Sequence, residues 1–266
     1  MTDYKLAVLI DADNVPYSMV TEMFEEISKN GTPTIKRIYA DWTTPTVVGW
    51  KKVLLENAIT PIQQYSYTSG KNSSDSALII DAMDILYSGK VTGFCIVSSD
   101  SDFTRLATRL REAGMIVIGF GEKKTPKPFI SACDKFIYLE ILKISTQEVQ
   151  DTPKTVAKPK PKAEPLSKVD AETIKLITES VNDLADESGW AFLGSLGNFI
   201  SKKKPDFDPR NYGFPKLLPL IKNINKFEID ERETGNSRIR HIFLRIKQAP
   251  TTRVLKPAAP QARNRR

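Results

Sequence analysis

Residues 6–14 read Leu6-Ala-Val-Leu-Ile10-Asp11-Ala-Asp13-Asn14, and they decide the fold class of this chain. Five apolar residues in a row fit a strand that is buried on both faces, as in parallel sheets covered by helices. The run stops at carboxylates, and sheets of this class bind ligands beyond the carboxyl ends of their strands. The stretch therefore predicts an α/β fold with a polar site directly after its first strand.

Short β-branched runs and amphipathic helical stretches alternate from here to about residue 145. We expect further strands at residues 35–40, 59–63, 94–97 and 115–119. We expect helices at residues 18–29, 47–57, 75–87 and 103–112, with Gly89 and Gly114 where two of them end. A strand followed by a helix, repeated along the chain, predicts a parallel sheet with helices on both faces.

Carboxylates follow three of the expected strands. Asp11 and Asp13 follow the first strand, Asp75 opens the helix after the third, and Asp100 and Asp102 follow the fourth. Carboxylates that meet in a small cleft repel one another unless a divalent cation lies among them. Because the chain has 1 histidine and 2 cysteines, oxygen ligands and therefore Mg²⁺ or Mn²⁺ are expected. Such ions stabilise charge on a transferring phosphoryl group, which indicates phosphodiester hydrolysis.

Helix capping is an alternative explanation for part of this pattern. Asp75 stands at an expected helix start, and Asp100 suits the N-cap of the next helix. Capping explains neither the position of Asp11 directly after an apolar strand nor the pairing of Asp100 with Asp102. The metal interpretation is therefore favoured for these carboxylates, whereas Asp13 is less favoured as a direct ligand.

Asp11 and Asp13 also match a second chemistry, because Asp-x-Asp after a first apolar strand opens phosphatases of the haloacid dehalogenase type. Asp11 would then be the nucleophile and Asp13 the acid or base. That pattern has Ser or Thr after the second strand, where this chain has Ala40-Asp41-Trp42. The phosphatase is therefore an alternative with less support from the motifs.

A proline-rich stretch separates two parts of the chain. Pro153, Pro159, Pro161 and Pro165 stand in a segment with almost no large apolar residues, which is typical of a semi-extended linker. We therefore expect a first domain at residues 1–145, a linker at 146–167, a second domain at 168–247 and a basic disordered tail at 248–266.

The net charge of +7 is concentrated at the C-terminal end. Residues 248–266 hold five basic and no acidic side chains, which suits either contact with a polyanion or simple solubility. The 40% apolar content is enough for a packed core. No stretch has the length and composition of a membrane span, and the N-terminal residues show no signal-peptide pattern. We expect a soluble, cytoplasmic protein.

Helices followed by a hairpin predict a winged-helix fold for the second domain. A helix is expected at residues 171–186, because Ile174, Ile177, Val181 and Leu184 recur at helical spacing. Two strands are expected at residues 227–229 and 239–246. The whole chain is thus expected to be a parallel α/β domain with a second, small α+β domain.

The second domain also carries candidate nucleic-acid contacts. The basic residues suited to phosphates are Lys202, Lys203, Lys204, Arg210, Lys216, Arg238 and Arg240. A solvated lysine face is the alternative. Four aromatic residues are interpreted as core or loop-fixing side chains rather than as base-stacking ones: Trp190, Phe207, Tyr212 and Phe214. His241 is interpreted as a surface residue of a strand.

The acidic motifs resemble those of the NYN family, which are PIN-like ribonuclease domains of the DUF88 and LabA type. They read Leu9-Ile-Asp11-Ala-Asp13-Asn14, Lys71-Asn-Ser-Ser-Asp75-Ser-Ala-Leu78 and Val97-Ser-Ser-Asp100-Ser-Asp102-Phe103. The resemblance covers residues 1–145 and implies an endonuclease that cleaves RNA with Mg²⁺ or Mn²⁺. It implies metal ligands at Asp11, Asp75, Asp100 and Asp102. It also implies that Asn14 orients a ligand or phosphate, and that Lys71 meets the scissile phosphate or solvates its loop.

The second domain resembles the OST-HTH/LOTUS domain, most specifically in Phe207-Asp-Pro-Arg-Asn-Tyr212-Gly213-Phe214 followed by Lys216-Leu217. This resemblance implies RNA binding, and in some members a preference for guanine-rich RNA or the docking of a helicase partner. Together the two resemblances imply a ribonuclease whose second domain selects the substrate. The alternative is a non-catalytic RNA-binding adaptor with a degenerate nuclease fold, against which the complete set of carboxylates argues.

Overall fold

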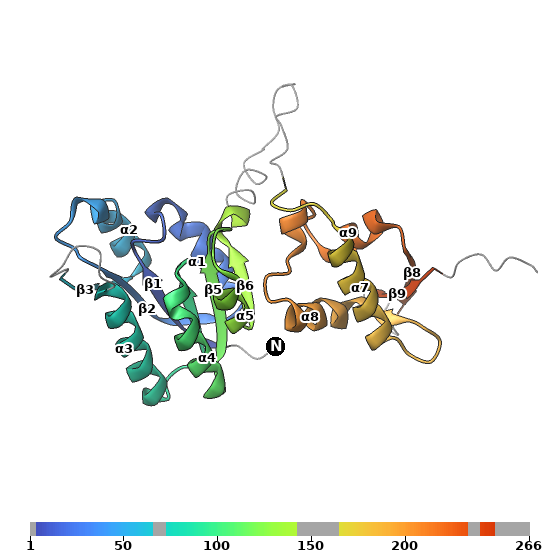
Figure 1. Ribbon diagram of the computed structural model, residues 1–266, viewed down its shortest axis with the longest axis horizontal. Coiled ribbons are helices and arrows are strands. Elements are labelled where there is room, and N and C mark those ends of the chain that lie inside the picture. The colour runs from blue at the N-terminus through green and yellow to red at the C-terminus, as the bar shows by residue number, and fades with distance from the viewer. Residues whose placement is uncertain (1–3, 66–72, 143–164, 234–239, 248–266) are drawn as a thin grey trace, which may run out of the picture.

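The computed structural model describes residues 4–65, 73–142, 165–233 and 240–247, which form two domains (Figure 1). The first domain is a sheet with helices on both faces, and the second is a smaller unit of helices and a short sheet. Within the described ranges, no helix is long and apolar enough to cross a membrane.

Parallel strands form the sheet of the first domain, in the order β3-β2-β1-β4-β5-β6. The strands are β1 (Lys5–Asp11), β2 (Thr32–Ala40), β3 (Thr60–Gln63), β4 (Gly93–Val97), β5 (Ile116–Gly121) and β6 (Lys135–Tyr138). The chain moves outward in one direction from β1 and in the other direction from β4, so the strand order reverses between these two. In open parallel sheets, ligands bind in the crevice at such a reversal.

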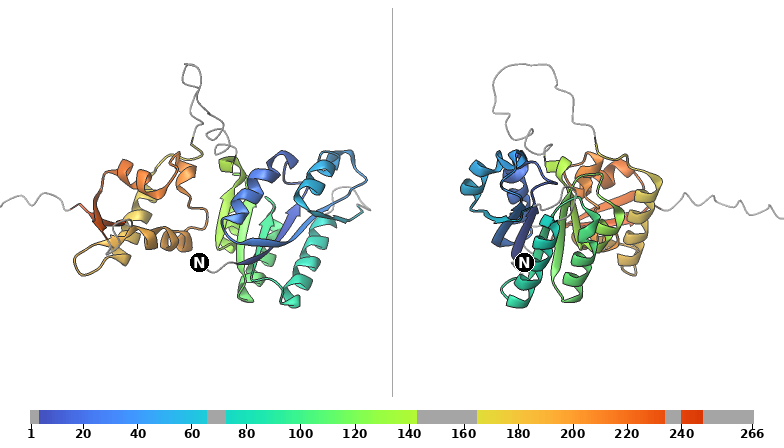
Figure 2. Two further views of the ribbon diagram at one scale, coloured as in Figure 1. Left: turned by 180° about the vertical axis from the view of Figure 1, so that it is seen from behind. Right: turned by 60° about the vertical axis from the view of Figure 1, so that its left-hand side comes forward.

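Helices cover both faces of this sheet (Figure 2). They are α1 (Val20–Ser28), α2 (Trp50–Asn57), α3 (Ser73–Ser88), α4 (Thr104–Glu112) and α5 (Lys127–Ala132), with 3-10 turns at Tyr17–Met19, Pro45–Val47 and Ser101–Phe103. Helices α1 and α2 pack on one face, and α3, α4 and α5 pack on the other.

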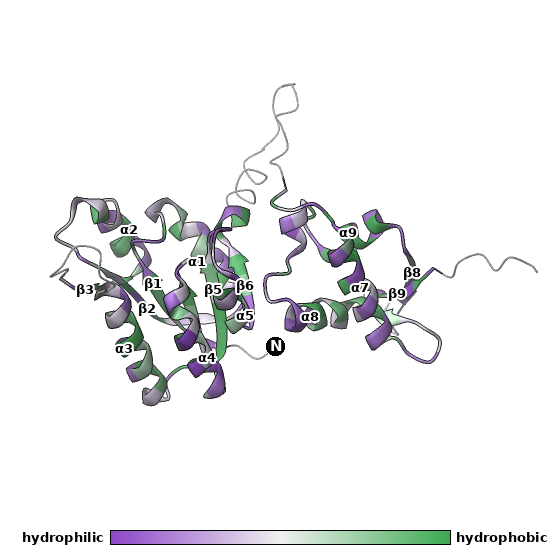
Figure 3. Ribbon diagram, in the orientation of Figure 1, coloured by the Kyte–Doolittle hydropathy of each residue, from purple (hydrophilic) through white to green (hydrophobic). Residues whose placement is uncertain are grey.

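The apolar run of β1 is continuous because its side chains pack alternately into two separate cores. Leu6, Val8 and Ile10 belong to the core beneath α1 and α2, whereas Ala7 and Leu9 belong to the core beneath α3, α4 and α5. In Figure 3, β5 is coloured as hydrophobic along most of its length, and hydrophilic colours gather on the outer side of α4. Burial on both faces leaves the strand ends as the place where this sheet presents polar groups.

The second domain packs its helices against a three-stranded antiparallel sheet of order β7-β9-β8. Its elements are α7 (Ala171–Leu184), β7 (Ala191–Phe192), α8 (Leu193–Lys203), a 3-10 turn (Pro209–Tyr212), α9 (Leu217–Ile224), β8 (Phe227–Glu233) and β9 (Arg240–Ile246). Asp170 begins α7 by accepting a hydrogen bond of 2.7 Å from the backbone N–H of Thr173. The core includes Ile177, Leu196 and Leu244, each of which is fully buried.

The second domain covers the outer edge of β6. The backbone N–H of Phe136 donates a hydrogen bond of 2.8 Å to the carbonyl oxygen of Pro205. The hydroxyl of Tyr138 donates one of 2.8 Å to the carboxylate of Asp206. An open edge strand leaves backbone groups unpaired and invites association, so this contact protects the sheet edge.

The structure confirms the predicted fold class and the order of the predicted elements, and it adds elements that the sequence analysis missed. These are β6, α5 and β7, which are too short for a hydrophobic period to be recognised. In the second domain the sequence analysis also gave no bounds for α8 and α9. Phe207 and Tyr212 lie in the core of the second domain, as expected. Trp190 does not belong to that core.

Candidate metal centre

The candidate site lies where the strand order of the large sheet reverses. Asp11 is the last residue of β1, and Ile10 pairs with Val97, the last residue of β4. The residues that follow Val97 therefore lie beside Asp11. The carboxylates that the sequence analysis assigned to separate strand ends thus meet at one edge of the sheet.

Asp11 is held by three donors in a nearly solvent-free position, with 1% of its surface exposed. One oxygen accepts a hydrogen bond of 3.2 Å from the backbone N–H of Asp13. The other accepts one from the side-chain amide of Asn14 and one of 2.9 Å from the hydroxyl of Ser98. Burial raises the pKa of Asp11, and the bonds from Asn14 and Ser98 oppose that rise. Asn14 is therefore a positioning residue for Asp11 in this structure.

Ser98 joins the ends of β1 and β4, and the sequence analysis did not single it out. Its hydroxyl donates to Asp11 and accepts a hydrogen bond of 3.1 Å from the backbone N–H of Asp100. The residue is fully buried. A Cβ at Gly121 would lie 2.7 Å from the carbonyl oxygen of Ser98, so β5 passes this close only with glycine. The position of Ser98 directly after a buried strand was the available sequence clue.

Three carboxylates form a compact group next to Asp11. Each of Asp75, Asp100 and Asp102 offers one oxygen, and these oxygens all lie within 4.8 Å of one another. Asp75 comes from the first turn of α3, and the other two come from the 3-10 turn region after β4. Burial, and then the charges of Asp11, Asp100 and Asp102, raise the pKa of Asp75 to about 6.

Capping accounts for one bond within this group. The side chain of Asp100 accepts a hydrogen bond of 2.9 Å from the backbone N–H of Asp102, and it is the N-cap of the 3-10 turn. A carboxylate has about four lone-pair positions, so this bond leaves room for a further ligand. Capping and metal binding are therefore compatible at Asp100. Asp13 is exposed and lies outside the group of three.

The donor set fits a hard divalent cation. All three grouped side chains offer carboxylate oxygens, which Mg²⁺ and Mn²⁺ prefer. The raised pKa of Asp75 indicates repulsion that a cation would relieve. Residues Asp75, Asp100 and Asp102 are the ones placed to hold such an ion, with Asp11 beside them.

The predicted nucleic-acid contacts differ in their exposure and in the protein groups that they already bind. Lys202, Lys216 and Arg240 are exposed, and Arg240 lies 3.5 Å from Glu231. Lys203 pairs with Asp183 at 2.6 Å, and Lys204 is hydrogen-bonded to the side chain of Tyr212. Lys71 and Arg238 lie outside the described residues.

Arg210 differs from the other predicted contacts because it lies between the two domains. Its guanidinium binds the carboxylates of Glu26 and Asp208. These bonds direct its donors to protein groups, so Arg210 is not placed to bind RNA.

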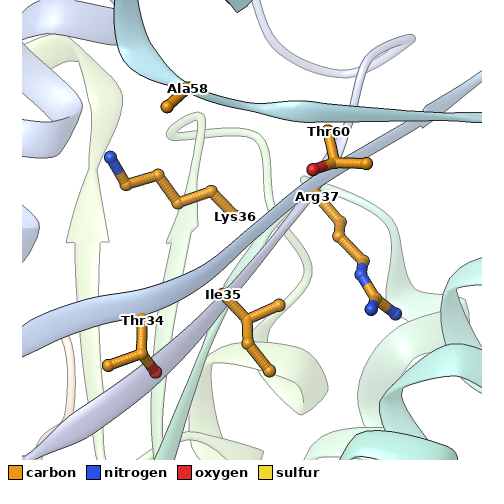
Figure 4. Close-up of a pocket in the computed structure, with 6 residues that line it drawn as sticks. All are labelled: Thr34, Ile35, Lys36, Arg37, Ala58 and Thr60. Carbon is orange, nitrogen blue, oxygen red and sulfur yellow. The ribbon is translucent and has the colours of Figure 1, made fainter.

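A hollow of about 370 Å³ lies on the outer part of the sheet (Figure 4). Its lining includes Lys36 and Arg37, which point to opposite sides of β2. Lys36 donates a hydrogen bond of 3.0 Å to the carbonyl oxygen of Asn57, and Arg37 pairs with Asp81. The hollow lies beside Thr60, at the start of β3, whereas the carboxylates follow the ends of β1 and β4. It is therefore separate from the candidate metal centre.

Comparison with protein families gives two matches in this chain. The NYN domain model matches residues 5–140, and the OST-HTH/LOTUS domain model matches residues 164–239. The two matches confirm both resemblances drawn from the sequence motifs. No curated protein matches the chain.

Two solved structures are similar to parts of this chain. A Vibrio parahaemolyticus protein of unknown function is 20% identical, with a TM-score of 0.43 over 50% of this chain and 91% of that chain. An uncharacterized Nitrosomonas europaea protein, solved by NMR, is 32% identical, with a TM-score of 0.29 over 37% of this chain and 94% of that chain.

Proposed function

We propose that this chain, which belongs to the NYN domain family and carries an OST-HTH/LOTUS domain after its nuclease-type domain, is a metal-dependent endoribonuclease. The second domain would bind the RNA that the first domain cleaves. The observation that carries the proposal is the group formed by Asp75, Asp100 and Asp102, whose oxygens lie within 4.8 Å of one another beside the buried Asp11.

The carboxylates have two roles in the proposed site. Asp75, Asp100 and Asp102 would hold Mg²⁺ or Mn²⁺, which would supply positive charge near the scissile phosphate. Asp11 adds negative charge from the floor of the site, and Asn14 and Ser98 keep its carboxylate in one orientation. A fixed arrangement of this kind lowers the reorganisation needed when charge develops on the phosphate.

The OST-HTH/LOTUS match of the second domain supports the choice of RNA as the substrate. Among its predicted phosphate contacts, Lys202 and Lys216 are exposed on the surface of this domain. Contacts from such side chains are independent of sequence and weaken with salt. We propose that they hold the RNA while the first domain cleaves it.

Cleavage of labelled single-stranded RNA and DNA by the full chain tests this function. The reactions contain EDTA, Mg²⁺ or Mn²⁺, with Asp100→Asn and Asp84→Asn in parallel. Asp84 is a matched control, because it is an exposed carboxylate on α3 outside the group of three. We expect metal-dependent cleavage of RNA that is lost in Asp100→Asn and kept in Asp84→Asn. Intact RNA in every reaction, with binding retained, would establish the non-catalytic adaptor instead.

A further inference from the structure

The sheet of the second domain has one face in the core and one face outside it. Strand β9 alternates, so Leu244 is fully buried whereas Phe243 and Arg245 on either side of it belong to the other face. Phe192 of β7 pairs directly with Phe243 and therefore shares that face. The core of the described part of this domain contains neither Phe192 nor Phe243.

Aromatic rings and guanidinium groups cover this outer face, which we call the aromatic face. It consists of Trp190, Phe192, His241 and Phe243 together with Arg232 and Arg245. The ring of Phe192 lies 5.0 Å from that of His241 and 5.6 Å from that of Phe243. Phe192 is 36% exposed, which places an apolar ring at the surface. Rings from two strands thus lie in one continuous row.

Two arginines extend the row. The guanidinium carbon of Arg232 lies 4.2 Å from the ring centre of Phe243 and 5.3 Å from that of Trp190. The guanidinium carbon of Arg245 lies 4.6 Å from the ring centre of Trp190. A guanidinium is planar and stacks on rings as a base does, so the row offers stacking surfaces and positive charge together.

Carboxylates on the same face hold the arginines in place. Asp230 accepts a hydrogen bond of 2.8 Å from Nε of Arg232. Glu228 accepts bonds from Nε and Nη2 of Arg245. An arginine has five N–H donors, so each of these two guanidinium groups has further donors that a ligand could use. These carboxylates also reduce the net charge of the face, which favours recognition by stacking over recognition by charge alone.

A tight turn directs Trp190 toward this row. The side chain of Asp186 accepts a hydrogen bond of 3.0 Å from the backbone N–H of Trp190 and also binds Ser188. Gly189 has a φ of 82°, which favours glycine. The side chain of Arg245 would lie 3.4 Å from a Cβ at Gly189. The ring of Trp190 is therefore placed by local hydrogen bonds rather than by burial in the core.

We propose that the aromatic face binds single-stranded RNA by stacking unpaired bases on its rings. Unstacked bases bind aromatic side chains and arginine planes in this way, and the phosphates require positive charge nearby. The guanidinium groups of Arg232 and Arg245 supply that charge among the rings. The inference rests on the proposed role of the second domain in binding RNA, and it names the surface and the form of the RNA.

The location of this face separates it from the metal centre. Strands β8 and β9 lie on the side of the second domain away from the first domain (Figure 1, Figure 2). RNA bound there leaves the carboxylate group accessible to another part of the same strand. The aromatic face would therefore capture substrate at a distance from the cleavage site.

Binding of RNA to the full chain in EDTA tests this inference without cleavage. The probe is a labelled single-stranded RNA of about 12 nucleotides, a length that spans one binding surface. We compare the native chain with the double variant Phe192→Leu/Phe243→Leu, which keeps apolar bulk and removes the rings. Phe199→Leu is the matched control, since Phe199 also has a cation over its ring, Lys203 at 4.6 Å, but lies on α8. We expect the double variant to lose about 10-fold or more in affinity and the control to lose none.

The fluorescence of Trp190 provides a second measurement that does not depend on the double variant folding. We expect added RNA to quench tryptophan emission in the native chain. The quench should disappear in Trp190→Phe, which retains Trp42 and Trp50, while the affinity of this variant stays within about 3-fold because a ring remains. Unchanged RNA affinity in the double variant together with an unchanged tryptophan signal would overturn the proposal.

Other results would identify a different partner or separate the two proposals. Equal affinity for single-stranded and double-stranded RNA would mean that charge rather than stacking dominates. Self-association of the native chain that Phe192→Leu/Phe243→Leu abolishes, without RNA binding, would assign the face to a second copy. RNA binding that is intact while cleavage is absent would overturn the nuclease and leave the aromatic face supported.

Discussion

The guanidinium of Arg210 in the second domain binds the carboxylate of Glu26 in α1 through two N–H donors, each 2.9 Å from its oxygen. The same guanidinium binds Asp208 within its own domain. Glu26 is 4% exposed, so this forked pair links the domains away from solvent. With the contacts of Phe136 and Tyr138 at the edge of β6, it makes the two domains one unit.

Arg210→Ala should separate the domains. The substitution leaves Glu26 with the ammonium of Lys29, at 2.7 Å, and the charge of Lys135, and breaking a buried pair on one side costs about 3–5 kcal/mol. We expect a larger radius of gyration in X-ray scattering and two unfolding transitions in calorimetry. Lys203→Ala is the matched control, because Lys203 pairs with Asp183 inside the second domain. A compact Arg210→Ala protein with a single transition would show that the other contacts suffice.

Acid should weaken the same contact. Burial alone would raise the pKa of Glu26, but hydrogen bonds and charge from Arg210 and Lys29 lower it to about 2 from the usual 4.5. A lowered pKa in the folded protein stabilises it above pH 4.5, and this stabilisation is lost as the pH falls from 4.5 toward 2. The difference corresponds to about 3 kcal/mol. Urea unfolding between pH 7 and pH 3 should show most of this loss in the native chain and a smaller one in Glu26→Gln.

Asp75→Asn should stabilise the metal-free protein and abolish its response to metal. Burial and the charges of its neighbours raise the pKa of Asp75 to about 6, so the ionised form opposes folding at neutral pH by roughly 1–3 kcal/mol. A neutral amide removes that repulsion and also removes a ligand. We expect a higher Tm than the native chain in EDTA and no further rise with Mg²⁺ or Mn²⁺. Asp84→Asn should change neither value, and a lower Tm for Asp75→Asn in EDTA would contradict the repulsion argument.

Ser98→Ala should lower cleavage by releasing Asp11. The lost hydroxyl removes a hydrogen bond of 2.9 Å to a buried carboxylate, which is worth about 1.5–3 kcal/mol. We expect cleavage to fall by about 10-fold or more with little change in RNA affinity. Ser99→Ala is the control, because the Ser99 hydroxyl accepts a bond from the backbone N–H of Glu122 and does not bind a carboxylate. Equal losses in both variants would indicate a structural effect at the end of β4.

The sequence by itself determined the fold class and the strand ends that carry the candidate site. A continuous apolar run at residues 6–10 requires burial on both faces, and the carboxylates after it and after Val97 are then at one edge of the sheet. The sequence carries this information because the apolar pattern of a buried strand or of a helix repeats within a few residues. The family of each domain also followed from short motifs in the correct order.

Only the tertiary structure decided which side chains meet. Ser98 binds Asp11 across 87 residues of sequence, and Arg210 binds Glu26 across 184 residues. Local sequence patterns carry no information on such pairs, because a hydrogen bond depends on where two distant segments are packed. For the same reason the sequence left both a core and a loop-fixing role open for Trp190, and the turn at Gly189 places its ring against two arginines on the outer face of the sheet. The types of residue were evident from the sequence, and their partners were set by packing.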